Sequence, residues 1–169
     1  MTAEVGLNLV ECCLNFVDCY NVYNSLGFDV EKTGHYNFKS AFDYAKKYWN
    51  TRNNNYNYYN GNNCANFVSQ CLVAAGVPQT STWSNGTYAF VNVNGLKNYF
   101  QNTYGVKYYS YPSASSISAG DIIYTSDHHV MVVMEKNGKG QVLASGNTNN
   151  RDCIVVTSFY GVLKTSELF

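Results

Sequence analysis

The sequence predicts an α+β domain in which helices come first along the chain and an antiparallel sheet follows. In the N-terminal half, apolar residues recur at the three- and four-residue spacing of amphipathic helices. From Gly120 onward they form short runs rich in Ile, Val and Met, which is typical of strands. No linker or internal repeat divides the 169 residues. The helices are therefore expected to pack on one face of the sheet.

Three helices are predicted before the sheet. The first begins near Leu9 and ends before Gly27, a residue type that favours helix C-termini, and the second spans 41–49. The third begins at Cys64, after an asparagine N-cap at position 62 or 63, and stops at a Gly-Val-Pro sequence. Its apolar residues have the spacing of one helical face: Cys64, Phe67, Val68, Cys71, Leu72 and Ala75.

The C-terminal half is expected to form the sheet. Residues 137–140 are predicted to make a hairpin turn between two of its strands. Residues 50–63 are nearly all Asn and Tyr and indicate an irregular loop that leads into the third helix. The four predicted strands are 121–125, 129–135, 141–145 and 153–158.

Charge excludes some partners and favours none. The chain has 11 Lys and Arg against 11 Asp and Glu, and its basic residues form no cluster, so neither nucleic acid nor an anionic membrane surface is an expected partner. The 16 tyrosines and many asparagines suit neutral substrates such as glycans or peptides, although an AT-rich genome would enrich the same residues. No apolar run is long enough for a transmembrane helix, and the first 25 residues show no signal peptide.

The six cysteines predict neither a disulfide framework nor a metal site. Cys12 and Cys13 are adjacent, and most of the others fall inside predicted helices or strands. This placement favours buried thiols in a reducing compartment. The chain contains neither CxxC nor HExxH, and no glycine-rich loop joins a strand to a helix. We therefore expect no zinc site and no phosphate-bearing cofactor.

Cys64 is the candidate nucleophile. It lies in the first turn of its helix, where exposed backbone N–H groups favour a thiolate, although its place on the apolar stripe favours a buried structural thiol. His129 opens a predicted strand and is the candidate base, while His128 points to the opposite face. Asn147 is a candidate to orient His129, because the hairpin brings the following strand back beside it.

The loop before Cys64 contains two further candidates. Tyr58 or Tyr59 could supply a hydroxyl to an oxyanion site, although in a chain so rich in tyrosine simple surface packing is the favoured reading.

Residues 61–70 read Gly-Asn-Asn-Cys-Ala-Asn-Phe-Val-Ser-Gln. This stretch resembles the nucleophile motif Asp-Cys-Thr-Asn-Phe-Val-Ser-Gln of the bacterial "putative amidase" domains. Those domains belong to the papain-like superfamily that includes NlpC-type and CHAP peptidoglycan hydrolases. The resemblance covers about residues 34–165. It is carried further by residues 36–49, Trp83, residues 91–99, Gly120 to Ile123, and His129 with Val130.

The resemblance implies a papain-like fold for residues 34–169. Residues 1–33 have no counterpart and are expected to be an N-terminal helical extension. The resemblance also implies Cys64 as nucleophile and His129 as base, and it places Asn66 beside the two tyrosines among the groups that bind substrate or oxyanion.

Two positions depart from the family pattern. Asn63 stands where an Asp is usual, and Asn147 stands where a His is usual. An Asn can still orient an imidazole by accepting a hydrogen bond from its N–H. The loss of a negative charge beside the thiol favours the thiolate.

The expected function is a cysteine amidohydrolase that cleaves an amide bond in bacterial peptidoglycan, either the muramoyl-peptide amide or a stem-peptide bond. It would then act at the cell wall or outside the cell, as a phage-type lysin, an injected effector or a fragment of a longer exported protein. Two alternatives remain open. One is a catalytically silent module that binds the wall or a partner, and the other is a cysteine acyltransferase, since an acyl-enzyme can be intercepted by an amine.

Overall fold

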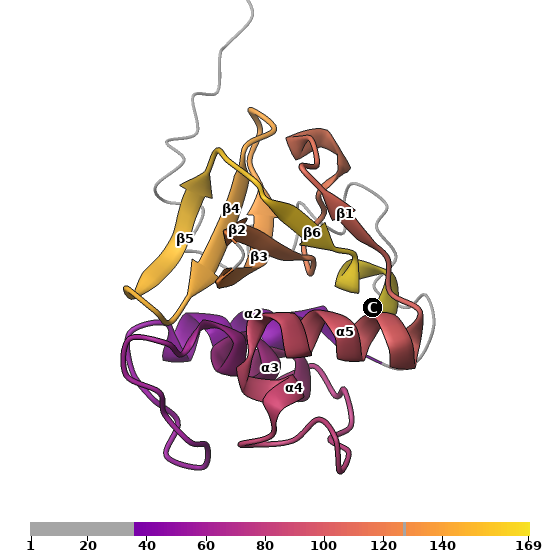
Figure 1. Ribbon diagram of the computed structural model, residues 1–169. Coiled ribbons are helices and arrows are strands. Elements are labelled where there is room, and N and C mark those ends of the chain that lie inside the picture. Colours follow the sequence, from indigo (N-terminus) through magenta and orange to yellow (C-terminus); the bar gives the residue numbers. More distant parts are fainter. Residues whose placement is uncertain (1–35, 127) are drawn as a thin grey trace, which may run out of the picture. The chain divides into compact units, whose positions relative to one another are not determined.

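The computed structural model describes residues 36–126 and 128–169, in which helices precede an antiparallel sheet (Figure 1). In Figure 1 the helices lie together in one layer below the sheet. The predicted α+β class is therefore confirmed. The predicted helix near Leu9 and the predicted extension 1–33 lie outside the described residues.

The elements follow one another in a simple order. The helices are α2 (Phe38–Tyr48), α3 (Cys64–Ala74), α4 (Tyr88–Val91) and α5 (Val93–Tyr104), with short 3₁₀ turns η2 (Ala114–Ser116) and η3 (Thr165–Leu168). The strands are β1 (Tyr108–Ser110), β2 (Ile122–Ser126), β3 (His129–Lys136), β4 (Val142–Gly146), β5 (Arg151–Val156) and β6 (Gly161–Leu163). No helix among the described residues has the length and apolar character needed to cross a bilayer.

The sheet is antiparallel throughout, with the strand order β1-β6-β2-β3-β4-β5. β2 and β3 form its centre, and Tyr124 pairs with Val130. β4 returns beside β3 with Val132 opposite Ser145. The predicted turn closes this hairpin: the Asn137 side chain accepts hydrogen bonds from the backbone N–H groups of Lys139 and Gln141.

Helix α3 is the central helix of the domain. Every residue from Cys64 to Leu72 is buried, on all sides of the helix and not only on one face. In a helix enclosed in this way, the polar side chains must form their hydrogen bonds within the protein. Ser69 does so by donating to the carbonyl oxygen of Phe90 at 2.8 Å, and Gln70 accepts from the Tyr44 hydroxyl at 2.5 Å.

The two faces of the sheet carry separate hydrophobic clusters. The larger cluster joins α3 and its neighbouring helices to the face that presents Tyr124 and Val130. The smaller cluster lies on the opposite face and contains Met131, Val133 and Ile117. Alternate residues of β3 therefore belong to different cores, as the two-residue period of a strand requires.

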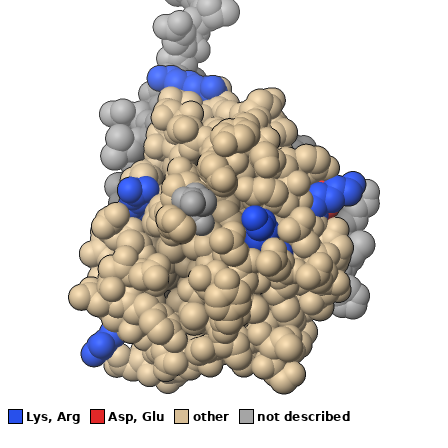
Figure 2. All heavy atoms as spheres, viewed as in Figure 1, with Lys and Arg blue, Asp and Glu red and all other residues tan. Residues whose placement is uncertain are grey.

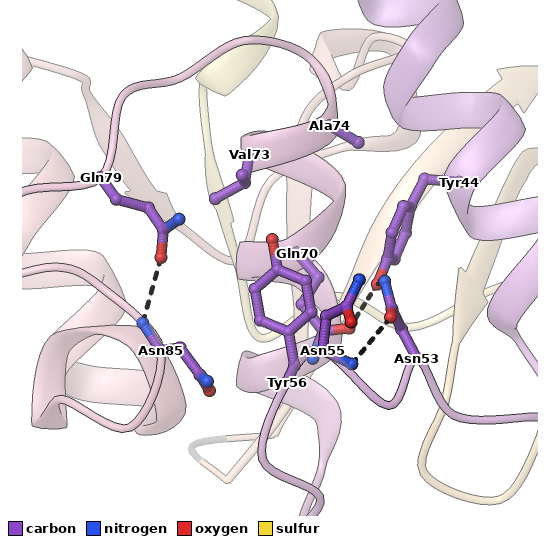
Figure 3. A pocket seen from close by; sticks show the side chains of 9 residues that line it. All are labelled: Tyr44, Asn53, Asn55, Tyr56, Gln70, Val73, Ala74, Gln79 and Asn85. Atoms are coloured by element: carbon purple, nitrogen blue, oxygen red, sulfur yellow. Dashed lines mark hydrogen bonds between the residues drawn. The ribbon is translucent and has the colours of Figure 1, made fainter.

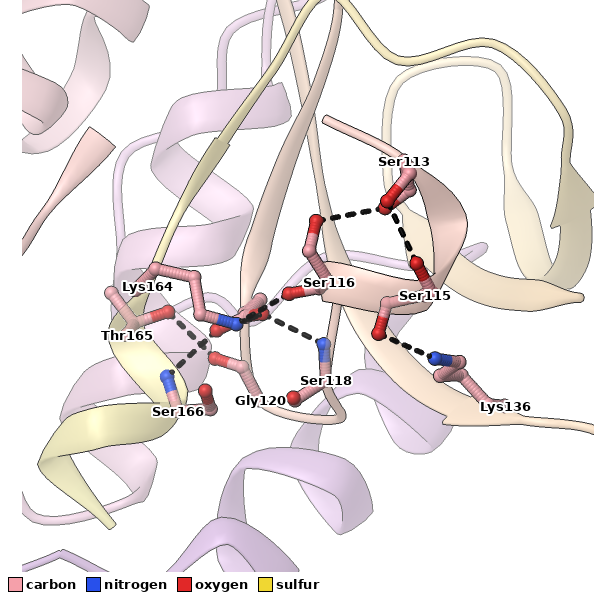
Figure 4. Close-up of polar contacts among 10 residues, drawn as sticks. Ser113, Ser115, Ser116, Ser118, Gly120, Lys136, Lys164, Thr165 and Ser166 are labelled. Atoms are coloured by element: carbon pink, nitrogen blue, oxygen red, sulfur yellow. Dashed lines mark hydrogen bonds and ion pairs between the residues drawn. The ribbon is translucent and has the colours of Figure 1, made fainter. Parts of the chain in front are cut away.

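A buried ion pair fastens the C-terminal turn to the start of β2 (Figure 4). Asp121 is fully buried and pairs with Lys164, while its carboxylate also accepts from the backbone N–H groups of Ser118 at 2.8 Å and Ser166 at 3.1 Å. Thr165 donates to the carbonyl oxygen of Gly120 at 2.6 Å. The Gly-Asp sequence at the start of β2 is thus a structural anchor in this fold.

Candidate active site at the start of helix α3

Cys64 is the first residue of α3, as the sequence predicts. Its side chain is only 2% exposed, and its thiol donates to the backbone carbonyl oxygen of His128 at 3.6 Å. The preceding residue, Asn63, makes no side-chain cap to the helix. The N–H groups of the first turn are therefore not satisfied by that side chain, and their partial positive charge lies beside the sulfur.

His129 is the first residue of β3 and is half-buried. Its Nε2 atom is buried without a hydrogen-bond partner among the described residues. Burial lowers the pKa of the imidazole below its usual value, and the positive charge of Arg151 lowers that pKa further. The ring is therefore a neutral imidazole near pH 7, which is the form that a general base requires.

The thiol and the imidazole come close through the backbone but do not form a hydrogen bond. The acceptor of the Cys64 thiol is the carbonyl of the residue that precedes His129. Val130 packs in the cluster that contains Cys64, whereas Met131 lies on the other face, where Arg151 contacts its sulfur at 3.8 Å. Strand alternation directs His129 toward the Met131 side. Catalytic hydrogen bonds often tighten only when substrate binds, so this geometry leaves His129 a candidate.

Asn147 does not orient His129 in this structure, contrary to the sequence-based expectation. Its Nδ2 atom donates to the carbonyl oxygens of Tyr48, Trp49 and Thr51 at 2.7, 3.2 and 3.0 Å. The hairpin does bring Asn147 back beside the start of β3, but its side chain points to the helix layer.

Asn147 instead supports the residue next to the candidate nucleophile. Its Oδ1 atom accepts from Asn63 Nδ2 at 2.8 Å. Asn63 Oδ1 in turn accepts from Asn66 Nδ2 at 2.8 Å, and its backbone N–H donates to Thr148 Oγ1 at 3.0 Å. The two positions that depart from the family pattern, Asn63 and Asn147, therefore touch each other.

Asn66 extends this amide network away from the sheet. Its Nδ2 atom also donates to the carbonyl oxygen of Asn57 at 2.7 Å, while its Oδ1 atom is buried and unpaired among the described residues. The network thus links the residue after β4 to the end of α2, to the loop that joins α2 to α3, and to α3 itself. Cys64 lies between Asn63 and Asn66 in sequence, so this network holds the backbone on both sides of the Cys64 sulfur.

The two loop tyrosines do not contact the thiol. Tyr58 is 43% exposed, and Tyr59 uses its backbone N–H to donate to Asn63 Oδ1 at 3.2 Å. Neither hydroxyl forms a hydrogen bond with Cys64 among the described residues. Their predicted oxyanion role gains no support from the geometry.

Tyr124 is a residue that the sequence analysis missed. Its hydroxyl is buried and has no hydrogen-bond partner among the described residues. The pKa of Tyr124 is raised chiefly by burial, and also by the nearby Tyr108 and Cys64. An unpaired donor in the electrostatic range of the thiol can hydrogen-bond a charged sulfur or oxygen during reaction. Strand alternation could have predicted this position, because Tyr124 is two residues after Ile122 and therefore shares the helix-facing side of β2 with it.

The remaining described cysteines differ from Cys64 in their surroundings. Cys71 is fully buried two helical turns later in α3, and burial raises its thiol pKa. Cys153 is partly buried in β5. Nowhere in residues 36–126 and 128–169 do three or more His, Cys, Asp or Glu side chains gather where they could hold a metal ion.

The family comparison matches residues 35–166 to the family described as "Putative amidase domain". The chain belongs to this family. Two Bacillus subtilis (strain 168) proteins are similar to it. It is 34% identical to Uncharacterized protein YjcM over 113 residues, which are 65% of this chain and 27% of that protein. It is 31% identical to Uncharacterized protein YhbB over 130 residues, which are 67% of this chain and 42% of that protein.

The chain therefore spans less than half the length of either of these relatives. No solved structure matches it. Membership of the amidase family indicates amide hydrolysis as the type of reaction, and it assigns neither the attacking group nor the substrate.

Proposed function

We propose that this domain is a papain-like cysteine amidohydrolase that cleaves an amide bond in bacterial peptidoglycan. The observation that carries the proposal is the position of Cys64. Its sulfur lies at the positive end of an 11-residue helix, and its thiol donates to the backbone carbonyl of His128, the residue before His129. A helix N-terminus favours a reactive thiolate, and the proposed reaction further requires the His129 ring to turn from the Met131 side toward the sulfur when substrate binds.

The proposed reaction uses an acyl-enzyme. His129 accepts the thiol proton, and the Cys64 sulfur attacks the amide carbonyl carbon to form a tetrahedral oxyanion. The oxyanion collapses, the C–N bond breaks, and His129 returns the proton to the departing amine. Water activated by His129 then hydrolyses the thioester and releases a carboxylic acid. The Cys64 backbone N–H and the Tyr124 hydroxyl are the proposed donors to the oxyanion.

The peptidoglycan assignment is supported by surface chemistry. The face drawn in Figure 2 is mostly uncharged, with a few separate Lys and Arg side chains and very little Asp or Glu. Such a surface suits a neutral glycopeptide better than a nucleic acid. A substrate in the wall places the proposed activity outside the cytoplasm.

The direct test is digestion of purified peptidoglycan, followed by mass spectrometry of the released fragments. Fragments should form with the wild-type protein and disappear with Cys64→Ala, and their masses name the bond. Cys71→Ala is the matched control, because this second α3 thiol is buried and its pKa is raised. A second matched pair is His129→Ala against His128→Ala, where only the first should abolish cleavage. Equal cleavage by Cys64→Ala and wild type would refute the cysteine mechanism.

The silent binding module is the second candidate, and one observation favours it. The Cys64 side chain is 2% exposed, and among the described residues it forms no hydrogen bond to an imidazole. Thiol labelling distinguishes the two functions. Fast modification at Cys64 relative to Cys71 supports catalysis, whereas uniformly slow modification together with wall binding supports the module. Product analysis with an added amine tests the acyltransferase, which would form a new amide in place of the acid.

A further inference from the structure

The chain contains four Asn-Gly pairs, and all four lie among the described residues. An asparagine that precedes glycine is prone to spontaneous deamidation, because glycine has no side chain to hinder the approach of its own nitrogen to the asparagine side chain. The pairs share the same local chemistry, so the folded structure must decide which of them reacts first. The four asparagines are Asn60, Asn85, Asn94 and Asn137.

Deamidation requires two groups of the pair to meet. The glycine backbone nitrogen attacks the side-chain carbonyl carbon of the asparagine, and the C–N bond of the side-chain amide breaks. Ammonia leaves with the proton that the glycine nitrogen loses, and a five-membered succinimide remains. Water then adds to one of the two ring carbonyls and gives aspartate or isoaspartate. Hydrogen bonds that hold either group away from this geometry must break before the ring can close.

The pairs at Asn94 and Asn137 are the most firmly held. Asn94 lies in the first turn of α5, where the N–H of Gly95 donates to Asn92 Oδ1 at 3.0 Å. The Asn137 side chain makes three hydrogen bonds. Its Oδ1 atom accepts from two backbone N–H groups at 3.0 Å, and its Nδ2 atom donates to Gln141 Oε1 at 2.8 Å. Neither pair can reach the attacking geometry while these bonds are kept.

The pair at Asn85 is held less firmly. Residues 84–87 form a turn closed by a backbone hydrogen bond of 2.9 Å, in which Gly86 has a φ of 88°. Figure 3 shows Asn85 at this turn, with its backbone N–H bonded to Gln79 at 3.2 Å. The Asn85 side chain accepts once, from the backbone N–H of Asn57 at 3.0 Å. One hydrogen bond therefore opposes rotation of this side chain.

The pair at Asn60 occupies a similar turn without such a bond. Residues 59–62 are closed by a backbone hydrogen bond of 3.0 Å, and Gly61 has a φ of 74°. Asn60 and Gly61 are both exposed, and a Cβ atom placed on Gly61 would meet nothing within 4 Å. Neither the Asn60 side chain nor the Gly61 N–H has a hydrogen-bond partner among the described residues. Rotation alone can bring the two groups together.

We propose that Asn60 is a site of spontaneous deamidation, and that it reacts before the other three Asn-Gly pairs of the folded protein. The reaction consumes only water and uses no group of the Cys64 site, so it does not depend on the proposed amidase chemistry. A catalytically silent protein would be modified at the same rate.

The position of Asn60 gives the modification a structural consequence. Asn60 is four residues before Cys64, and the backbone N–H of its neighbour Tyr59 donates to Asn63 Oδ1 at 3.2 Å. An isoaspartate adds a methylene group to the main chain inside the turn, so the bond between Tyr59 and Asn63 loses its present geometry. The modification therefore acts on the amide network that holds the backbone around the sulfur.

The test is peptide mapping by tandem mass spectrometry after incubation of the whole chain in mildly alkaline buffer made with H₂¹⁸O. The heavy oxygen marks each carboxyl group that forms during the incubation. In the folded protein the label should enter at Asn60 at least about fivefold faster than at Asn85, which must break one hydrogen bond. Asn94 and Asn137 should react more slowly still.

Unfolding the chain in guanidinium chloride provides the matched control. Without the fold the four sites should react at similar rates, since each is an asparagine before a glycine. Asn60→Gln should remove the label at position 60 and leave the other three rates unchanged, because closure through a glutamine needs a less favourable six-membered ring. Asn85→Gln should leave the rate at Asn60 unchanged. The proposal is overturned if the folded protein gains no label at Asn60, if another pair reacts at least as fast, or if the unfolded chain shows the same ratios.

Discussion

Substitution of Asn147 by Ala tests whether this side chain stabilises the fold as the structure indicates. Asn147 is buried and joins the end of β4 to the loop after α2 and to Asn63. Its two amide hydrogens are shared among three carbonyl oxygens, and its oxygen accepts once. The side chain therefore contributes about three hydrogen bonds, all made away from solvent.

The loss can be converted into a measurable shift. Each buried hydrogen bond contributes about 1 kcal/mol net, so Asn147→Ala should lower the free energy of unfolding by about 3 kcal/mol. For a domain of this size that corresponds to a fall in Tm of about 10 °C. The assay is urea unfolding followed by circular dichroism, with Asn98→Ala on α5 as control, since an exposed amide should change stability by less than about 0.5 kcal/mol.

Asn147→Asp provides the sharper version of this test. The variant keeps the shape but directs a carboxylate at three carbonyl oxygens, so it should be less stable than Asn147→Ala near pH 7. The pKa of the new carboxyl must rise in the folded state, and stability should therefore recover as pH falls through that raised value and the acid becomes a donor. If both variants unfold at the wild-type urea concentration, the assigned hydrogen bonds do not stabilise the fold.

Three further predictions concern other buried groups. The pKa of His129 is lowered in the folded state, so the unfolded chain binds more protons and the free energy of unfolding should fall as pH drops below about 6.5. This dependence on pH should be shallower in His129→Gln. A steeper dependence in the variant than in the wild type would contradict the lowered pKa. Tyr124→Phe removes a buried hydroxyl that has no partner among the described residues, so Tm should stay unchanged or rise, while kcat for the proposed cleavage of peptidoglycan should fall. A lower Tm would mean that the hydroxyl has a partner in solution. Lys164→Met leaves the buried Asp121 charge without its ion-pair partner and should lower the free energy of unfolding by about 3–5 kcal/mol. The double variant Lys164→Met with Asp121→Asn should regain most of this loss. A double variant as unstable as the single one would contradict the pairing.

Local sequence patterns predicted the elements with strong periodicity or clear end signals. The period of α3 and its Gly-Val-Pro stop predicted a helix at 64–75, and the structure has it at Cys64–Ala74. The hairpin around 137–140 was predicted from its turn residues. Helix α5 was not predicted, although Val93, Leu96 and Phe100 have the spacing of one helical face and Gly105 caps its end in the left-handed conformation. β1 and β6 are three residues each, too short for a period of two to show.

For the candidate site, too, the sequence predicted local features but not contacts between distant residues. The sequence determined that Cys64 opens a helix and that His129 opens a strand, because both follow from local spacing and end signals. It could not determine which side-chain partners these residues take. Asn147 was expected beside His129 on the basis of hairpin geometry, but strand alternation sends the two side chains toward different layers of the fold.

By itself, then, the sequence determined the α+β class, the position of the candidate thiol at a helix start and the neutral character of the surface, since each depends on residues close together in the chain or on composition alone. Only the tertiary structure decided that Asn63, Asn66 and Asn147 form one hydrogen-bonded network and that Tyr44, Asn53 and Gln70 form another. These groups come from segments far apart in sequence. Their partners are set by how helices pack on the sheet and by which atoms burial leaves unpaired.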